Sequence, residues 1–388
     1  MIFASGLACA HGDETRLDGG TQNDSVGTSG VTLDTIDPTV FSTSAATDVS
    51  VTASTTGSTG PDADSSSEIS ADSTSTGSGG SGPTVVMVTP EDGAMGIDPG
   101  TAITVEFSAA MDPASITAAD GGCRGAIALS DDDFTSCIGL DASVVTDRDN
   151  TSFTVTPSTP LSSARSYRVR VTTAATADDS TPLAQEFSSE GFVSRYFHTI
   201  GIDGVDDWNG DEGLPTSTDG HVGRVAWDST YVYVGLRSPA VASPNGAVWV
   251  VFYFGGAGGS TDGVLYNTQS PALPFAARWH LRWRADNLFT DVLEYDGAAW
   301  SPGGWAIADG DVYQQGELLE LRVARADLDD PDQLELHLGT LREADLDEAS
   351  WAGCPEGSYV DGYDPDYSQR WQFDLTGSAS PAEHVPVP

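Results

Sequence analysis

The sequence predicts an all-β protein with two β-sandwich domains that follow a disordered N-terminal tether. Three observations lead to this prediction. Beyond residue 83, short alternating runs of apolar and polar residues are bounded by Pro, Gly, Asp or Ser, which is typical of antiparallel strands and turns. All nine tryptophans and nine of the eleven tyrosines lie beyond residue 200, so two folded parts differ in composition. Residues 42–82 are nearly all Ser, Thr, Gly, Ala and Asp, which offer too little apolar surface to offset the entropy of ordering.

The first nine residues resemble the end of a bacterial lipoprotein signal that lacks its beginning. Gly-Leu-Ala-Cys at positions 6–9 makes Cys9 the residue to be lipidated, although the basic segment that normally precedes such a motif is missing. A start codon assigned too late would explain this. The alternative is a short disordered N-terminus with an incidental cysteine. Residues 10–82 are expected to be a disordered tether or plain linker, whose flexible part would reach roughly 45 Å.

The charge of the chain limits its partners. Its 58 acidic residues outnumber 16 basic ones, all arginine, and give a formal net charge of -42. Such a surface repels nucleic acid and anionic membranes. No run of 18 apolar residues is present, so the sequence predicts no membrane-spanning helix.

Two of the four cysteines are candidates for a disulfide. Cys123 and Cys137 lie close together in one predicted domain, and none of the cysteines forms a C-x-x-C motif. A disulfide between them would stabilise the domain by roughly 3 kcal/mol and would need an oxidising compartment. The alternative is a pair of free thiols. Cys354 is left over.

Residues 83–200 are expected to form the first sandwich. The motifs are Pro90-Glu91-Asp92-Gly93, Ile103–Phe107 leading into Met111-Asp112-Pro113, Phe153–Pro157, Tyr167–Val171 and Phe197-His198-Thr199. In these motifs the segment resembles the bacterial Ig-like domains of surface-layer and adhesin proteins. The resemblance implies a spacer without catalysis.

Residues 201–376 are expected to form a second, larger and more aromatic sandwich, with a disordered tail at 377–388. The motifs are Ile202-Asp203-Gly204, Arg224–Asp228 leading into Tyr231–Val234, Ala247–Phe254 and Gly316–Leu328. Through them the segment resembles the family 9 carbohydrate-binding modules and the wider DOMON-like sandwiches. The resemblance implies a face able to bind sugar.

The family 9 modules place one aromatic residue of the sugar site in the loop before the central strand, and this sequence has none there. The loop before the central strand, Ser243–Gly246, carries no aromatic residue. Other aromatic side chains are therefore predicted to wall the site, since aromatic faces stack on the C–H faces of sugars. These candidates are Trp300, Trp305, Trp351, Tyr359 and Tyr363. The alternative places these rings in the core or at its rim.

The stretch RWHLRWR at 278–284 is predicted to be one strand of a hairpin. Alternation directs Trp279, Leu281 and Trp283 to one face and the basic residues to the other. The conservative interpretation puts the apolar face in the core and pairs the cations with acidic neighbours such as Asp291. The alternative is that Arg282 and Arg284 face a groove and bind an acidic glycan or carboxylate.

The acidic stretch at 203–213 is a candidate for a structural calcium ion. Asp203, Asp207, Asn209 and Asp211 supply the oxygen ligands that calcium prefers, although the spacing is not that of an EF-hand. The alternative is a solvated acidic turn. No other cofactor is predicted.

No catalytic motif of the metalloprotease, nucleophile-elbow or P-loop type is present, so the chain is not expected to be an enzyme. The sequence predicts a monomeric binding protein on the outer face of a bacterial cell envelope, or secreted, that recognises a glycan or another cell-surface component. The alternative is a structural or adhesive surface protein whose second sandwich makes protein–protein contacts.

Overall fold

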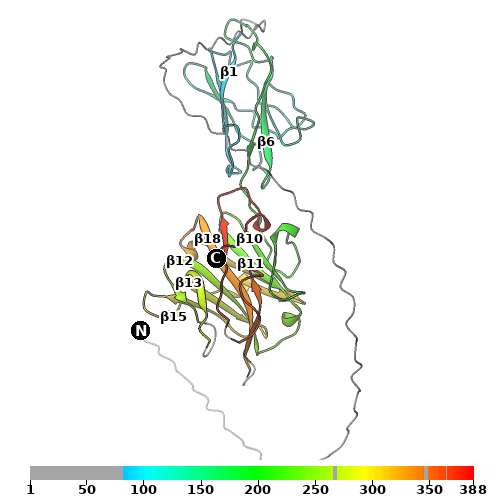
Figure 1. Ribbon diagram of the computed structural model, residues 1–388. Helices are drawn as coiled ribbons and strands as arrows, with labels where there is room; N and C mark the ends of the chain where they lie inside the picture. Colours follow the sequence, from blue (N-terminus) through cyan, green and yellow to red (C-terminus); the bar gives the residue numbers. More distant parts are fainter. Residues whose placement is uncertain (1–81, 265–268, 345–347, 364) are drawn as a thin grey trace, which may run out of the picture. The chain divides into compact units, whose positions relative to one another are not determined.

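The structure, a computed structural model, describes residues 82–264, 269–344, 348–363 and 365–388 (Figure 1). Within these ranges the regular elements are strands and short 3-10 turns, which confirms the prediction of an all-β protein. No helix in the described ranges is long and apolar enough to cross a membrane. Cys9 and nearly all of the predicted tether lie outside the described residues. The 3-10 turns are η1 (Gly210–Glu212), η2 (Pro239–Val241), η3 (Asp309–Asp311), η4 (Arg325–Leu328) and η5 (Pro381–Glu383).

The first sandwich consists of two antiparallel sheets. One sheet has the order β1 (Val85–Thr89), β2 (Ile103–Phe107), β5 (Ser152–Val155) and β4 (Val145–Thr146). The other contains β3 (Ile127–Ser130), β6 (Ser166–Val171), β7 (Phe187–Ser188) and β8 (Phe192–Val193), with both β7 and β8 pairing with β6. Alternate residues of β2 and β6 are buried, as expected when only one face of each strand meets the core.

A disulfide joins Cys123 and Cys137 at the margin of this sandwich. The bond closes a loop of sequence separation 14 beside β3. Phe134 and two buried alanines pack around the sulfur atoms in a small cluster of their own. The disulfide therefore fixes an insertion that contributes little to the main core.

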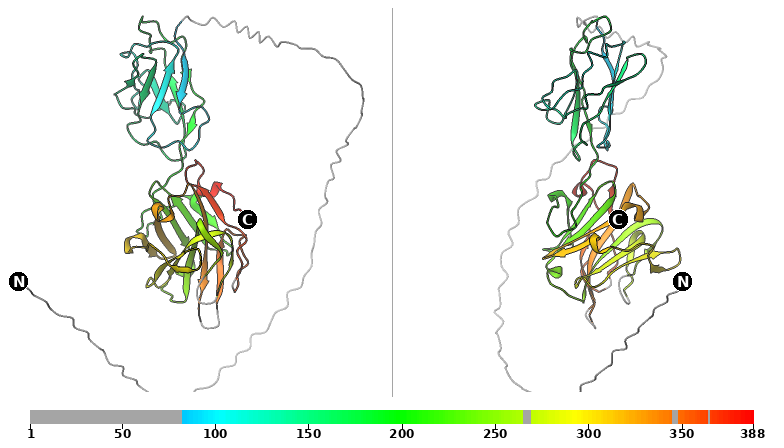
Figure 2. Two further views of the ribbon diagram at one scale, coloured as in Figure 1. Left: turned by 90° about the vertical axis from the view of Figure 1, so that its left-hand side faces the viewer. Right: turned by 180° about the vertical axis from the view of Figure 1, so that it is seen from behind.

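The second sandwich contains a five-stranded and a seven-stranded antiparallel sheet (Figure 2). The smaller sheet has the order β16 (Val312–Gln315), β17 (Leu318–Ala324), β11 (Tyr231–Arg237), β10 (Val222–Trp227) and β9 (Gly213–Pro215). The larger has the order β15 (Trp300–Pro302), β14 (Thr290–Tyr295), β13 (Ala272–Arg284), β12 (Val248–Asp262), β18 (Gln333–Arg342) and β19 (Ala349–Cys354), and β20 (Trp371–Asp374) also pairs with β18.

Both faces of the seven-stranded sheet are covered by apolar side chains. The inner cluster lies between the sheets and includes Trp279, Leu281 and Trp283 of β13, so the predicted apolar face of RWHLRWR is confirmed. A separate outer cluster is built on the opposite face by Trp249, Val251 and Tyr253 of β12. Tyr359 and Tyr367, from the segment after β19, cover this outer cluster. A strand of this sheet is therefore buried on both sides over part of its length.

Two boundaries differ from the prediction. Tyr196 belongs to the inner cluster of the second sandwich, so this domain begins before residue 201. The prediction of a disordered tail at 377–388 is wrong: Val387 pairs with Arg370, and His384 packs edge-on against Trp227 and Phe373. The tail contains no run of apolar residues, so its composition predicted disorder. It is held by main-chain pairing and by the ring of His384.

Candidate functional site

The predicted arginine candidates on β13 are engaged with carboxylates. Arg282 forms an ion pair with Asp291 on the neighbouring strand, and Arg284 Nε donates to Asp286 Oδ1 over 2.8 Å. The Arg284 guanidinium lowers the pKa of the Asp286 carboxyl. This geometry agrees with the conservative interpretation of RWHLRWR and differs from a row of arginines that faces an open groove, because acidic neighbours lie within reach of each guanidinium.

The aromatic candidates do not come together as the walls of one sugar site. Trp305 packs against the inner cluster, whereas Trp300 and Tyr359 belong to the outer cluster. Tyr359 is buried, and its hydroxyl donates to the carbonyl oxygen of Trp351 over 3.0 Å. Tyr363 is 60% exposed and belongs to neither cluster. The candidate rings are therefore divided between the inner cluster, the outer cluster and the exposed surface.

Most indoles of the second sandwich are used to build its interior. Six of the nine tryptophans in the sequence are buried in the structure, and the other three, Trp300, Trp305 and Trp351, are half-buried. The indole nitrogen of Trp300 donates to the carbonyl oxygen of Asp262, which holds its ring at the sheet edge. No tryptophan in the described ranges offers a fully exposed platform for stacking.

A buried histidine, His337, packs against the outer cluster, and no acidic side chain in the described ranges is hydrogen-bonded to it. The rings of His337 and Tyr367 are stacked with centroids 4.0 Å apart, and His337 Nε2 lies 2.9 Å from Ser358 Oγ. Burial lowers the pKa of His337 to about 3. His337 is thus neutral in the folded protein over the whole physiological range.

This burial makes the second sandwich sensitive to acid. An unfolded histidine takes up a proton near pH 6.5, but folded His337 does so only near pH 3, so stability is complete above pH 6.5 and falls as the pH drops below it. We expect wild type to lose about 2–3 kcal/mol more than His337→Phe between pH 6.5 and 4.5. Denaturant unfolding at several pH values measures this, and His280 stays in both proteins. Parallel pH curves would contradict the expectation.

Hydrogen bonds organise the loop of the predicted calcium site. Asp203 and Asp207 accept the main-chain N–H groups of Val205 and Gly201, each over 2.9 Å. No group of three or more His, Cys, Asp or Glu side chains in the described ranges gathers in a way that could hold a metal ion. Asp211 therefore belongs to no such group. Asp203 and Asp207 therefore serve as turn-forming acceptors.

Two buried glutamates that the sequence did not single out hold this loop. Glu320 accepts the N–H of Gly204 over 2.9 Å and the indole N–H of Trp208 over 3.2 Å, and burial raises its pKa. Glu212 accepts the main-chain N–H of Asn209, the fourth predicted ligand, over 2.6 Å. Acidic residues of the region thus point inward at donors as well as outward at solvent.

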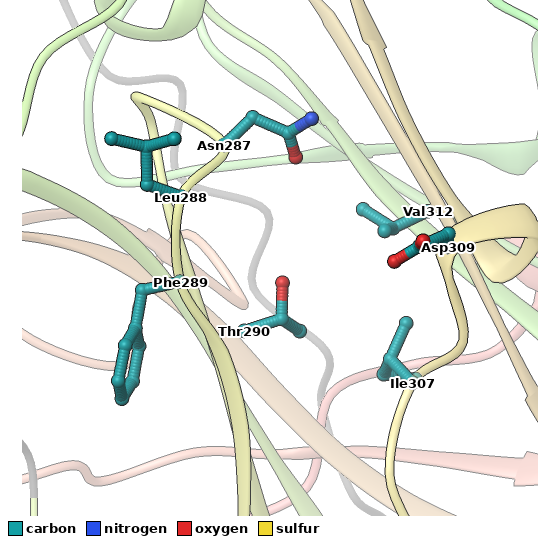
Figure 3. A pocket seen from close by; sticks show the side chains of 7 residues that line it. All are labelled: Asn287, Leu288, Phe289, Thr290, Ile307, Asp309 and Val312. Carbon is teal, nitrogen blue, oxygen red and sulfur yellow. The ribbon is translucent and has the colours of Figure 1, made fainter. Parts of the chain in front are cut away.

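One hollow with uncommitted polar groups is a cleft at the edge of the second sandwich, which we call the edge cleft. It has a volume of about 270 Å³. It lies where the β13–β14 hairpin of the larger sheet meets β16, the edge strand of the smaller one. Its lining residues are Asn287, Leu288, Phe289, Thr290, Ile307, Asp309 and Val312. Figure 3 shows Asn287, Thr290 and Asp309 directed into the cleft, whereas Leu288 and Phe289 point away from it.

The amide of Asn287 is held in place by the core. Asn287 occupies the hairpin turn with a left-handed φ of 55°, which asparagine tolerates well. The buried indole of Trp283 donates to its Oδ1 over 2.9 Å. Since an indole N–H can only donate, the amide orientation is fixed and Nδ2 remains a donor. The turn therefore presents a fixed donor at the rim of the edge cleft.

A second hollow of about 410 Å³ has acidic groups that are already paired. Its acidic residues are Asp329 and Glu335. Asp329 forms an ion pair with Arg278 at 2.5 Å, and Glu335 forms one with Arg370 at 2.6 Å. A ligand there would have to compete with these ion pairs, so the edge cleft is the stronger candidate.

Comparisons with known proteins identify the first domain only. Residues 80–194 match the family model described as a bacterial Ig-like domain. No curated protein matches the chain. The chain is similar to the solved N-terminal part of the bacterial S-layer protein SbsC at 14% identity and a TM-score of 0.23, covering 63% of this chain and 44% of that one. The chain is also similar to the solved structure of domains 1–6 of the surface layer protein SbsC. The identity is 11% and the TM-score 0.23, and the alignment covers 66% of this chain and 39% of that one.

A third solved structure is native alpha-2-macroglobulin from Escherichia coli, spanning domains MG0-NIE-MG1. It is 11% identical with a TM-score of 0.21, and the alignment covers 80% of this chain and 91% of that one. The chain spans less than half the length of both S-layer structures. At these TM-scores the likeness supports no statement about function. What the comparisons establish is that residues 80–194 match the family model of a bacterial Ig-like domain.

Proposed function

We propose that this chain is a non-catalytic protein of the bacterial cell surface, in which the Ig-like domain is a spacer and the second sandwich makes adhesive contacts. The observation that carries this proposal is the succession of a bacterial Ig-like domain and a second closed β-sandwich in one chain. The Cys123–Cys137 disulfide supports a location outside the cytoplasm, because such bonds persist in oxidising compartments. Lipidation at Cys9 and a flexible tether at 10–82 would hold both domains at the outer face.

Carbohydrate is the partner that we favour. The edge cleft supports this choice, since it combines uncommitted polar groups with an apolar wall. The second candidate is a protein partner. It is supported by the burial of most tryptophans, which leaves the second sandwich without a fully exposed tryptophan in the described ranges.

Adhesion of the purified full chain to isolated bacterial envelopes tests the proposal and separates the two partners. Envelopes are used untreated, after periodate oxidation, which destroys vicinal diols of glycans, or after protease digestion. We expect binding that periodate removes and protease leaves intact. Loss after protease alone would favour the protein partner. If the chain binds no envelope preparation at all, the adhesive function is wrong.

A further inference from the structure

We propose that the edge cleft binds a single neutral sugar residue through Asn287, Thr290 and Asp309, independently of any aromatic clamp. This inference rests on the proposed adhesive function and names its ligand class and its site. Asn287 and Thr290 belong to the β13–β14 hairpin, and Asp309 lies just before β16. The packing of the two sheets brings these segments together.

The hydrogen-bonding groups of the cleft are uncommitted. In the described part of the chain, the Thr290 hydroxyl, the Asp309 carboxylate and Asn287 Nδ2 have no hydrogen-bond partner, whereas Asn287 Oδ1 is held by Trp283. Nδ2 can only donate, the carboxylate can only accept and the hydroxyl can do both. Vicinal sugar hydroxyls, each of which donates and accepts, match this set of groups.

The remaining features of the cleft narrow the ligand class. Ile307 and Val312 form an apolar wall against which the C–H face of a sugar ring can pack. The carboxylate of Asp309 and the net charge of -42 oppose an anionic sugar. A metal ion is not favoured either, because no cluster of three acidic, histidine or cysteine side chains exists in the described ranges.

The size of the cleft sets the length of the ligand. Its volume of about 270 Å³ lies just under the range of about 300–1,000 Å³ that holds drug-sized ligands. One sugar residue fits this space, and the rest of a glycan would extend into solvent. We therefore expect recognition of a terminal residue rather than of a chain segment.

An NMR titration of the full chain with neutral methyl glycosides of glucose, galactose, mannose and N-acetylglucosamine tests the inference. We expect at least one of them to shift the indole N–H of Trp283 and the amides of 287–290 and 309–312 in a saturable manner. Methyl glucuronide should bind at least about tenfold more weakly. Thr290→Val and Asn287→Gly should each weaken binding about five- to tenfold. Thr290→Val removes the hydroxyl alone, whereas Asn287→Gly removes the Nδ2 donor together with the Oδ1 that accepts the indole N–H of Trp283.

A matched control separates loss of the ligand contact from a change in the turn. Glycine adopts the left-handed conformation of Asn287 without strain, so Asn287→Gly keeps the hairpin. Asn150→Gly makes the same change at a second left-handed asparagine, φ 54°, in the Ig-like domain and should leave binding unchanged. If no glycoside shifts these resonances, or if both cleft variants bind as wild type does, the inference is overturned. If the chain adheres to envelopes but no glycoside shifts these resonances, the proposed sugar site is wrong and the proposed adhesive function is not contradicted.

Discussion

Replacing Glu212 by alanine is expected to lower the free energy of unfolding of the second sandwich by about 3–5 kcal/mol. Glu212 is fully buried. It accepts the hydroxyl of Tyr196 over 2.5 Å and the main-chain N–H of Asn209 over 2.6 Å, and its Oε1 lies 2.7 Å from His198 Nδ1. The substitution leaves the buried hydroxyl of Tyr196 without an acceptor and opens a cavity, and both effects are costly. Urea unfolding followed by tryptophan fluorescence measures it, because all nine tryptophans lie in this sandwich.

The chain contains its own control for this experiment. Glu383 occupies the equivalent place in turn η5, where its carboxylate accepts the N–H of Ser380 over 2.7 Å, but Glu383 is exposed. Glu383→Ala should therefore cost less than about 1 kcal/mol, since solvent replaces the lost acceptor. Equal effects of the two substitutions would show that the buried network around Glu212 does not stabilise the domain.

Removing the disulfide by the double substitution Cys123→Ala/Cys137→Ala is expected to destabilise the Ig-like domain by about 3 kcal/mol. The bond closes a loop of sequence separation 14, and opening it restores conformational freedom to the unfolded chain. Native-state hydrogen exchange of the full chain measures this, because it reports on each domain separately. Amides of β3 and β6 should exchange faster in the variant.

The second sandwich serves as the internal reference for the disulfide experiment. Exchange of the amides in β11 and β17 should be the same in wild type and variant, because those strands share no cluster with either cysteine. Wild type under reducing conditions should behave like the double variant. Unchanged exchange in β3 and β6 would mean that the insertion is not coupled to the folding of the domain.

The strands of this protein could be predicted because their side chains obey a local rule. Alternation along RWHLRWR places Trp279, Leu281 and Trp283 on one face, and the structure buries all three between the sheets. The acidic neighbours of the arginines were equally predictable, since the turn at 285–287 brings β14 beside β13. Registers of this kind depend on residues close together in sequence.

The site could not be predicted because its parts are joined only by tertiary packing. The candidate tyrosine Tyr359 covers the outer face of the larger sheet, and alternation does not reveal that this face is covered at all. The acidic loop at 203–213 is shaped by Glu320, more than a hundred residues later in the chain. Likewise, Thr290 and Asp309 meet only where the two sheets come together, so no sequence pattern marks the edge cleft.

A crystal structure of the full chain with the tightest-binding neutral methyl glycoside tests the central claim most directly. The account predicts one sugar ring in the edge cleft, with hydroxyl groups within hydrogen-bonding distance of Asn287 Nδ2, Thr290 and Asp309. A sugar stacked instead on Trp300 or Trp351, with the edge cleft empty, would contradict it.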